Sequence, residues 1–473
     1  MSTNEHGRTF DVVVIGGGIV GAAMARELGA TSLDVAILEA RGDVGDGTSK
    51  ANTAILHTGF DAKPGTLESR LVARGYDLLG AYAEQVGIPV ERTGAILVAW
   101  TLEELAALPS LKEKAEQNGY DRCQIIDADA VYAEVPDLGE GVLGGLTVPG
   151  ESIICTWTTN LALATEAVDR GVTLLTSHRV EGLERYGRRT RLMTDQGPVT
   201  ATWVINAAGL GADWIDEMFG HHRFTVTPRR GELFVFDKQS RPKVPKIVLP
   251  VPSSKGKGVL VSPTIYGNVM LGPTAEDLHD RTATGTSEDG FAFLLEKGGR
   301  LMPTLLDEEV TASYAGLRAA TEHGDYVIEL DAEQQYLLLG GIRSTGLTAG
   351  MAIAEHATGL LADAGVDVTP RPESSLPEPP LMPHIGEAGA RPYQDDELIA
   401  ADPAYGEIVC FCERVTRGEV RDAFCSSIPP TDLDGLRRRT RIMNGRCQGF
   451  FCGANVQALL DSAGTSTETE AAR

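Results

Sequence analysis

Four cysteines near the C-terminal end are the residues whose type and spacing point most directly to chemistry. Cys410 and Cys412 are separated by one residue; Cys447 and Cys452, which follow after a gap of 34 residues, are separated by four. Four thiolates are the ligand set of a [2Fe–2S] cluster. Zinc is the alternative, but zinc knuckles usually have two residues between their cysteines, and neither pair does. A third reading, inert structural cysteines, also stays open.

The cysteines lie in a basic stretch of an acidic chain. Residues 410–453 contain eight arginines, no lysine and five acids, a net charge of +3, whereas the whole chain carries −24. A cluster with four thiolate ligands is anionic, so a basic shell would stabilise it. The same patch could instead dock an acidic redox partner. Cys425 lies outside the spacing pattern and is expected in the core. The arginines are Arg414, Arg417, Arg421, Arg437, Arg438, Arg439, Arg441 and Arg446.

A glycine-rich turn near the N-terminal end predicts a nucleotide site. Gly16, Gly18 and Gly21 fit the pattern G-x-G-x-x-G, between a predicted strand over 11–15 and a helix. The first glycine permits the tight turn, the second lets the backbone approach a pyrophosphate, and the third lets helix and strand pack closely. The helix N-terminus offers N–H groups and a positive dipole end to the phosphates. Glu39, which ends the next strand 21 residues after Gly18, would accept hydrogen bonds from ribose hydroxyls and disfavours the extra phosphate of NADP.

The elements that must hold these residues indicate an α/β chain. The strand, a helix ending near Leu28 and a second strand over 35–38 form a βαβ start. Residues 67–131 are expected to be mostly helical, with 102–118 the clearest run, and 157–170 is a further helix. Short strands then dominate and suggest a second, largely antiparallel sheet. These strands are expected at 203–206, 233–236, 246–249, 258–261 and 268–271, with a last strand at 336–339 before a helix at 349–362.

The composition changes after this large unit, residues 9–365. Residues 366–395 are rich in proline, with six prolines between 369 and 390, so they form either a linker or a belt laid over the surface. A small module over 396–460 follows. Residues 461–473 are polar and low in bulk and are expected to be disordered.

Charge and composition exclude several classes of protein. With 42% hydrophobic and 23% charged residues, the chain is an ordinary globular protein with a sizeable core. A net charge of −24 repels phosphate backbones and anionic membrane surfaces, so nucleic acid is not an expected partner. No apolar run is long enough to span a membrane, and residues 1–8 lack the apolar region of a secretory signal. Seven cysteines without an export signal indicate the reducing cytoplasm.

Four further segments resemble the D-amino-acid-oxidase-like flavoprotein superfamily. Residues 204–209 form an apolar strand that ends in small residues, and 340–348 form a turn that enters a helix. Residues 47–52 and 55–59 resemble the stretch that passes the FAD phosphates and the ring in the glycerol-3-phosphate dehydrogenase and 2-hydroxyglutarate dehydrogenase branch. The resemblance covers the chain up to about residue 360, and it implies that the nucleotide is FAD.

The resemblance also implies the architecture: a Rossmann-like FAD-binding domain with an inserted, mainly antiparallel substrate sheet, followed by a small C-terminal iron–sulfur domain. In this superfamily the last turn directs a helix N-terminus toward the flavin ring, where the helix dipole stabilises the anion of the reduced flavin. The cofactor-binding residues implied, besides the glycines of the turn and Glu39, are Thr48, Ser49, Asn52, Ala208, Gly209, Gly341, Gly346, Leu347 and Thr348.

The C-terminal module resembles the bacterioferritin-associated-ferredoxin-like [2Fe–2S] domain. The similarity lies in the cysteine spacing and in residues 408–409, 439–441 and 445–449, and it implies that the four cysteines bind the cluster. A flavin domain followed by this module resembles the catalytic subunits of the anaerobic glycerol-3-phosphate dehydrogenase family. Because a flavin takes two electrons and the cluster passes one at a time, the combination implies export to a protein or quinone-linked acceptor, with further subunits plausible.

Three residues are candidates for substrate chemistry. Arg318 matches the position where related enzymes hold a substrate anion, and a guanidinium suits carboxylate or phosphate; a surface ion pair is the alternative. Arg343 replaces an acid that hydroxy-acid relatives tend to carry. A second positive charge there would favour a phosphate, or would only stabilise reduced flavin. His57 is the candidate general base for the hydroxyl proton, with a structural or cofactor-contacting role as the alternative.

These residues lead to one preferred function and two alternatives. The preferred function is an FAD-dependent dehydrogenase that oxidises a small anionic alcohol, with glycerol 3-phosphate or a related polyol phosphate as the expected substrate. A 2-hydroxy-acid or amino-acid dehydrogenase would share Arg318. An electron-transfer subunit, whose flavin only passes electrons between partners, is the alternative of another class.

Overall fold

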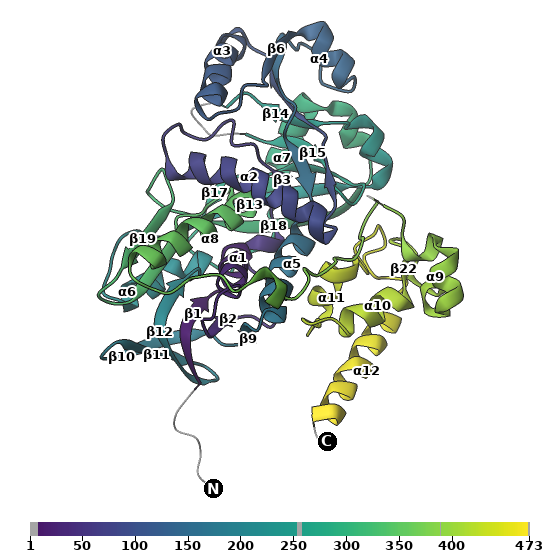
Figure 1. Cartoon of the computed structure of the whole chain (residues 1–473). Helices are drawn as coiled ribbons and strands as arrows, with labels where there is room; N and C mark the ends of the chain where they lie inside the picture. The colour runs from purple at the N-terminus through teal and green to yellow at the C-terminus, as the bar shows by residue number, and fades with distance from the viewer. Residues whose placement is uncertain (1–7, 253–257, 388, 472–473) are drawn as a thin grey trace.

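The N-terminal strand lies at the centre of an eight-stranded sheet (Figure 1). The computed structural model describes residues 8–252, 258–387 and 389–471. The order along this sheet is β10-β11-β12-β1-β2-β9, with β20 on β12 and β19 on β20, and the strands from β9 to β20 by way of β1 run parallel. The strands are β1 Thr9–Ile15, β2 Val35–Leu38, β9 Thr173–Leu175, β10 Val180–Tyr186, β11 Arg189–Thr194, β12 Gly197–Asn206, β19 Val327–Asp331 and β20 Tyr336–Gly340.

The helices that cover this sheet explain why its central strands β1 and β2 are mostly apolar. Helices α1 (Ile19–Leu28), α5 (Thr156–Asp169) and α8 (Gly346–Asp363) pack against one another on one face, where Val12 and Val14 of β1 are buried. The opposite face, with Val13 and Ile15, packs toward α6 (Ala212–Met218). A parallel strand covered on both faces reads as a continuous hydrophobic run. The predicted βαβ start is therefore confirmed.

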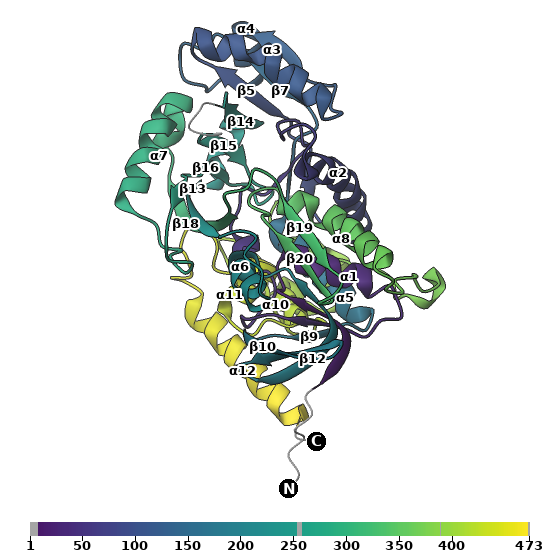
Figure 2. The ribbon, with the colours of Figure 1, turned by 90° about the vertical axis from the view of Figure 1, so that its left-hand side faces the viewer.

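A second sheet of nine strands carries the inserted part, as predicted, and extends away from the first (Figure 2). Its order is β17-β13-β16-β15-β14-β5-β7-β6, with β18 on β13, and its pairs are antiparallel except for β14 with β5. The strands are β5 Ala95–Ala99, β6 Gln124–Asp127, β7 Gly144–Val148, β13 Thr227–Phe236, β14 Ile247–Pro250, β15 Leu260–Pro263, β16 Val269–Gly272, β17 Glu276–Asp277 and β18 Val310–Ala320.

One expectation about the strands is corrected. Residues 203–206 belong to β12 of the first sheet, where they run parallel to β1, and not to the antiparallel sheet. Residues 67–131 are mostly helical, as expected, with α2 (Leu67–Val86), α3 (Leu102–Gln117) and the start of α4 (Ala128–Glu134), but they also contain the unexpected strands β5 and β6. All five residues of β5 are buried. An apolar run of that length has no periodicity that separates a strand from a buried helix.

Smaller elements complete the large part of the chain. A three-stranded sheet joins β3 (Ile55–Leu56), β8 (Ser152–Ile154) and β4 (Val90–Glu91). Helix α7 (Glu288–Leu301) packs on the second sheet. Among the described residues, no helix has the length and apolar character needed to cross a bilayer.

Residues 366–395 form a belt on the surface of the large part, the second of the two expected arrangements. The N–H of Arg371 donates to the carbonyl of Ala30 at 2.7 Å, and the N–H of Met382 donates to the carbonyl of Val86 at 2.8 Å. Met382 and Ile385 are buried in the main core. The belt is therefore attached along its course, although Ala388 lies outside the described residues.

The C-terminal module has its own small core, which includes Cys410 and Cys452. Helix α12 runs from Gly453 to Ala471, so the structure differs from the expected disorder over 461–471; residues 472–473 lie outside the described part of the chain. Cys425, expected in the core, is exposed. The elements are α9 Asp396–Ala401, β21 Ile408–Cys410, β22 Val415–Thr416, α10 Arg417–Phe424, α11 Leu433–Thr440 and α12.

Candidate active site and cluster site

The glycine turn connects β1 to α1 at the carboxyl edge of the parallel sheet. Gly16 has φ +110°, and a Cβ on Gly21 would lie 1.9 Å from the Gly16 carbonyl oxygen, so neither position tolerates a side chain. A Cβ on Gly16 would also lie 2.5 Å from the carbonyl oxygen of Ala207. The turn thus meets the segment with Ala208 and Gly209, because β1 and β12 are parallel neighbours that end at one edge.

The N–H groups at the start of α1 point at side-chain oxygens. The N–H of Gly17 donates to Glu39 Oε2 at 2.7 Å, and the N–H of Ile19 donates to Ser49 Oγ at 2.9 Å. Burial raises the pKa of Glu39, although the N–H groups of Arg41 and Gly17 oppose this change. Gly18 is the N-cap of α1. These bonds hold Glu39 and Ser49 at the N-terminus of α1, whose positive dipole end suits phosphates.

The other predicted cofactor residues lie in the segment 48–59 or near the start of α8, which contacts this segment. Thr48 Oγ1 donates to the carbonyl of Leu317 at 2.9 Å, and Asn52 Nδ2 donates to the carbonyl of Ser49 at 2.9 Å. Thr348 Oγ1, in the first turn of α8, accepts from the N–H of His57 at 3.0 Å. Gly341 has φ +67° in the turn before this helix, and Gly346 and Leu347 begin it. Strand β18, the segment 48–59 and the start of α8 are thus brought together.

His57 is paired with an acid that the sequence analysis did not identify. Its Nδ1 lies 2.9 Å from Oε2 of Glu151, whose side chain is 1% exposed. The other carboxylate oxygen of Glu151 accepts from the N–H and the hydroxyl of Thr58 at 2.6 and 2.8 Å. A carboxylate that accepts from Nδ1–H fixes the histidine tautomer and leaves Nε2 as the nitrogen able to take up a proton.

Arg318 is a partly buried cation. Its Nη2 donates to the carbonyl of Thr274 at 2.6 Å, and within the described ranges no carboxylate lies within 4.0 Å of its guanidinium. Burial lowers the pKa of Arg318, and the charge of Arg229 adds to this effect. The surface ion pair considered from the sequence is therefore not what the structure contains.

Strand β18 holds Arg318 against the segment 48–59. A Cβ on Gly316 would lie 2.3 Å from the carbonyl oxygen of Ala51, so the two backbones touch. Tyr314, also on β18, donates its hydroxyl to the carbonyl of Asn52 at 2.8 Å. The sequence analysis did not identify Tyr314, whose pKa is raised because its hydroxyl is shielded from water.

The guanidinium of Arg343, unlike that of Arg318, lies close to a carboxylate. Its guanidinium lies 3.6 Å from Glu68 Oε2 and donates to the carbonyls of His323 and Gly324 at 3.4 and 3.3 Å. Its side chain is 35% exposed. Its charge is therefore partly balanced, and it is less available to a substrate anion than that of Arg318.

The four cysteines meet as two pairs. Cys410 interacts directly with Cys452, and Cys412 with Cys447, while the two pairs also influence each other electrostatically. In the part of the chain that the structure describes, no three ligand-type side chains gather around a single ion position. The four thiols are thus close to one another, and four thiolates are the ligand set of a [2Fe–2S] cluster.

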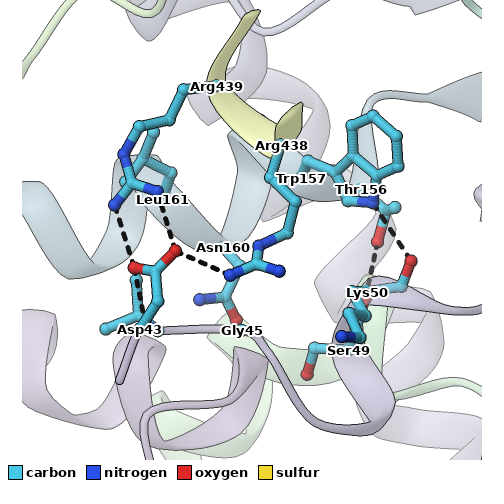
Figure 3. Close-up of a pocket in the computed structure, with 11 residues that line it drawn as sticks. Asp43, Gly45, Ser49, Lys50, Thr156, Trp157, Asn160, Leu161, Arg438 and Arg439 are labelled. Carbon is cyan, nitrogen blue, oxygen red and sulfur yellow. Dashed lines mark hydrogen bonds and ion pairs between the residues drawn. The ribbon is translucent and has the colours of Figure 1, made fainter. Parts of the chain in front are cut away.

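The eight arginines of the basic stretch are all paired with acids, and both roles suggested for them from the sequence stay predictions. The ion pairs across to the large part join Arg438 to Asp43 and Asp46, Arg439 to Asp43, and Arg446 to Asp237 and Glu309. Figure 3 shows Arg438 and Arg439 of α11 reaching Asp43 beside Trp157 and Asn160 of α5. The remaining five pair with Glu387, Glu407, Asp402, Asp434 and Glu413.

Comparisons with known proteins find a matching family for the large part and another for the C-terminal module. The model of the FAD dependent oxidoreductase family, DAO, matches residues 11–360, and that of the BFD-like [2Fe-2S] binding domain matches residues 408–462. A glycerol 3-phosphate dehydrogenase of Caloramator mitchellensis is 35% identical over 453 residues, which cover 95% of this chain and 94% of the relative. One of the subunits of the anaerobic glycerol-3-phosphate dehydrogenase of Escherichia coli K12 is 26% identical, and the match spans 99% of this chain and 91% of that relative.

A solved structure is similar over the large part. The L-alpha-glycerophosphate oxidase from Mycoplasma pneumoniae, determined with FAD bound, superposes with a TM-score of 0.75 at 29% identity. The match covers 80% of this chain and 100% of that one.

Proposed function

Because the chain belongs to the FAD-dependent oxidoreductase family and ends in a BFD-like [2Fe-2S] binding domain, its cofactors are FAD and a [2Fe–2S] cluster, and we propose that it oxidises glycerol 3-phosphate or a related polyol phosphate. The residues present fit the FAD. The glycine turn opens α1 where its N-terminal dipole would favour the pyrophosphate, and the partly buried carboxylate of Glu39, held by the N–H of Gly17, would accept from the ribose hydroxyls.

One observation carries the substrate class: Arg318 is a partly buried guanidinium without a carboxylate within 4.0 Å among the described residues. A desolvated cation without a close counter-charge is costly, so such a site is suited to an anionic ligand. The names of the relatives, glycerol 3-phosphate dehydrogenase and L-alpha-glycerophosphate oxidase, support a phosphate as that anion.

The side chains of the chain supply binding and proton transfer. Arg318 holds the phosphate and thereby orients the carbinol carbon. His57 accepts the hydroxyl proton at Nε2, and the buried carboxylate of Glu151 stabilises the imidazolium that forms. When bound, FAD supplies the acceptor for the hydride, and the cluster passes the electrons on singly.

A second candidate is a 2-hydroxy acid. Arg343 was the reason to prefer a doubly charged phosphate, but Glu68 and two carbonyls already engage it. The single remaining cation, Arg318, also suits a carboxylate. An L-2-hydroxyglutarate dehydrogenase of Arabidopsis thaliana is 27% identical over 73% of this chain.

An anaerobic substrate screen tests the proposal. The holoenzyme is mixed with glycerol 3-phosphate, other polyol phosphates, 2-hydroxy acids and amino acids, and bleaching of the oxidised flavin is followed near about 450 nm. We expect bleaching with glycerol 3-phosphate at the lowest concentration. Bleaching only by hydroxy acids would move the assignment to the second candidate, and bleaching by none of the compounds would refute a small-molecule substrate.

The wider setting of the enzyme is also a proposal. We propose a protein or quinone-linked acceptor, because the cluster releases electrons one at a time. We further propose a cytoplasmic location, since all seven cysteines are free thiols and a thiolate-bound cluster suits a reducing compartment. The division into residues 9–365, 366–395 and 396–460 is proposed as three units of the chain.

A further inference from the structure

We propose that Trp157, Tyr266 and Arg441 form the route by which electrons pass from the flavin to the cluster within one chain. This inference rests on the proposed function only in the source of the electrons. The three side chains come from the start of α5, from the turn between β15 and β16, and from the residue after α11. They are packed together at the boundary between the large part and the C-terminal module.

The route begins at the segment expected beside the flavin. Trp157 Nε1 donates to the carbonyl of Lys50 at 3.1 Å, and the adjacent Thr156 Oγ1 donates to the carbonyl of Ser49 at 3.1 Å. Farther along α5, Asn160 Nδ2 donates to the carbonyl of Gly17 in the glycine turn at 3.2 Å. The first two turns of α5 therefore touch the cofactor-facing backbone directly.

The middle of the route is a stack of aromatic rings. The rings of Trp157 and Tyr266 are stacked with centroids 5.1 Å apart. The guanidinium carbon of Arg441 lies 4.1 Å from the centroid of Tyr266 and 5.9 Å from that of Trp157. Tyr266 is 8% exposed and Arg441 is 4% exposed, so water is largely excluded.

The route ends at a cluster ligand. Arg441 Nε donates to Glu413 Oε2 at 2.8 Å, and Glu413 is bonded through the main chain to Cys412. Arg441 Nη2 also donates to Asn268 Oδ1 at 3.4 Å, in the same turn as Tyr266. The other large contact between the two parts, Asp43 with Arg439, leads into α11 and not to a cysteine.

The rate of electron tunnelling falls steeply with distance across a gap and less steeply through polarisable groups in contact. The contacts between these three side chains therefore matter for the rate. Close-packed interiors offer such contacts without voids. Each step moves one electron: the reduced flavin loses it and a ferric iron of the cluster gains it. The bridging residues keep their oxidation state, and none of their bonds is made or broken. Two steps remove the two electrons of one substrate hydride, the proton that remains is released to water, and an external one-electron acceptor empties the cluster between the two steps.

The test is the rate of electron transfer inside the loaded protein. The holoenzyme with both cofactors is reduced at the flavin anaerobically, once by glycerol 3-phosphate and once by a light-driven chemical donor. The reduced cluster is followed by its visible absorbance and its electron paramagnetic resonance signal. The chemical donor separates the two proposals: if the substrate fails to reduce the flavin, the proposed function fails while the route is still measured.

Trp157→Leu and Tyr266→Leu are expected to slow cluster reduction by roughly tenfold or more, with flavin reduction by the donor unchanged. Tyr266→Phe keeps the ring and should keep the rate. Trp100→Leu, the same substitution at the tryptophan that follows β5 and contacts Arg300, is the matched control and should have no effect.

Two outcomes would overturn the proposal. One is cluster reduction at the unaltered rate in both leucine variants. The other is loss of FAD or cluster from both variants, which would assign these side chains to assembly rather than to transfer. A ring-dependent rate in fully loaded protein, retained by Tyr266→Phe, is a result that packing alone does not produce.

Discussion

Asp43 and Arg439 face each other across the boundary between the large part and the cluster module, joined by hydrogen bonds of 2.7 and 2.9 Å that engage both carboxylate oxygens. Arg438 adds a third bond to the same carboxylate at 2.7 Å. The Asp43 side chain is 2% exposed and that of Arg439 3%. Asp43 lies between Glu39 and Ser49, so the module is docked on the loop that approaches the cofactor.

Replacing Asp43 with alanine should loosen the module. The substitution leaves the buried guanidinium of Arg439 without its counter-charge and that of Arg438 with Asp46 alone, and breaking a buried ion pair from one side costs about 3–5 kcal/mol. We expect faster proteolysis of the belt over 366–395 and a lower denaturant midpoint for release of the module. Asp434→Ala is the control, because its pair with Arg437 is exposed and should be worth less than about 1 kcal/mol. Equal losses in both variants would contradict the docking role.

The same carboxylate predicts an acid dependence. Burial alone raises the pKa of Asp43, but the hydrogen bonds and charges of Arg439 and Arg438 outweigh it and hold the pKa below its ordinary value of 3.8. A lowered folded pKa contributes stability that is complete above the ordinary value and is lost as the pH falls through the folded value. Docking strength should therefore hold down to about pH 4 and then fall. The denaturant midpoint of Asp43→Asn, measured over the same pH series, should lack this fall.

Removing Arg318 should abolish most of the binding of the substrate anion. Loss of one partner from a buried charged contact costs about 2–5 kcal/mol, so kcat/KM for glycerol 3-phosphate should fall by about 30-fold to 1,000-fold or more in Arg318→Ala. Arg229→Ala is the control, since Arg229 is more exposed and already paired with Asp277. Anaerobic flavin bleaching at a series of substrate concentrations measures both. An unchanged kcat/KM would remove the observation on which the substrate class rests.

Arg343 should matter much less. Because Glu68 and two carbonyls engage its guanidinium, Arg343→Ala should change kcat/KM by less than about fivefold, the scale of a partly exposed ion pair. The loss should be similar for phosphates and for 2-hydroxy acids. A loss confined to phosphates would show that Arg343 turns from Glu68 to the substrate.

His57→Gln should lower kcat by about 10²-fold to 10⁴-fold with little change in KM, because the hydroxyl proton loses its acceptor. Glu151→Gln should lower it by about 10-fold to 100-fold, since it only orients and stabilises the ring of His57. His222→Gln, on a side chain that is 78% exposed, should have no effect. Flavin bleaching at saturating substrate gives these rates, and normal rates in His57→Gln would assign the proton to another group.

The features predicted from sequence are those that neighbouring residues determine. The glycine turn needs Gly16 and Gly21 because the backbones touch there, and the requirement is visible in one short stretch. The βαβ start follows from the buried runs of β1 and β2. The spacing of Cys410, Cys412, Cys447 and Cys452 expresses ligand chemistry and does not depend on the rest of the fold.

The features that were missed depend on partners far away in the chain. Glu151 has no local signal, since it becomes a candidate only beside His57, 94 residues earlier. The basic stretch was visible, but Asp43 lies 396 residues before Arg439, and charge counts do not identify such a partner. The strand β5 was missed because five apolar residues fit either kind of element.

The belt over 366–395 has a consequence for kinetics. It is bonded to the large part at Arg371 and Met382, and Asp43 fixes the module at its end. A domain on a loose tether would have to find its docking site by diffusion before each exchange, whereas this one is already seated. The internal exchange therefore needs no encounter, and only the final handover to a separate molecule depends on the concentration of that molecule.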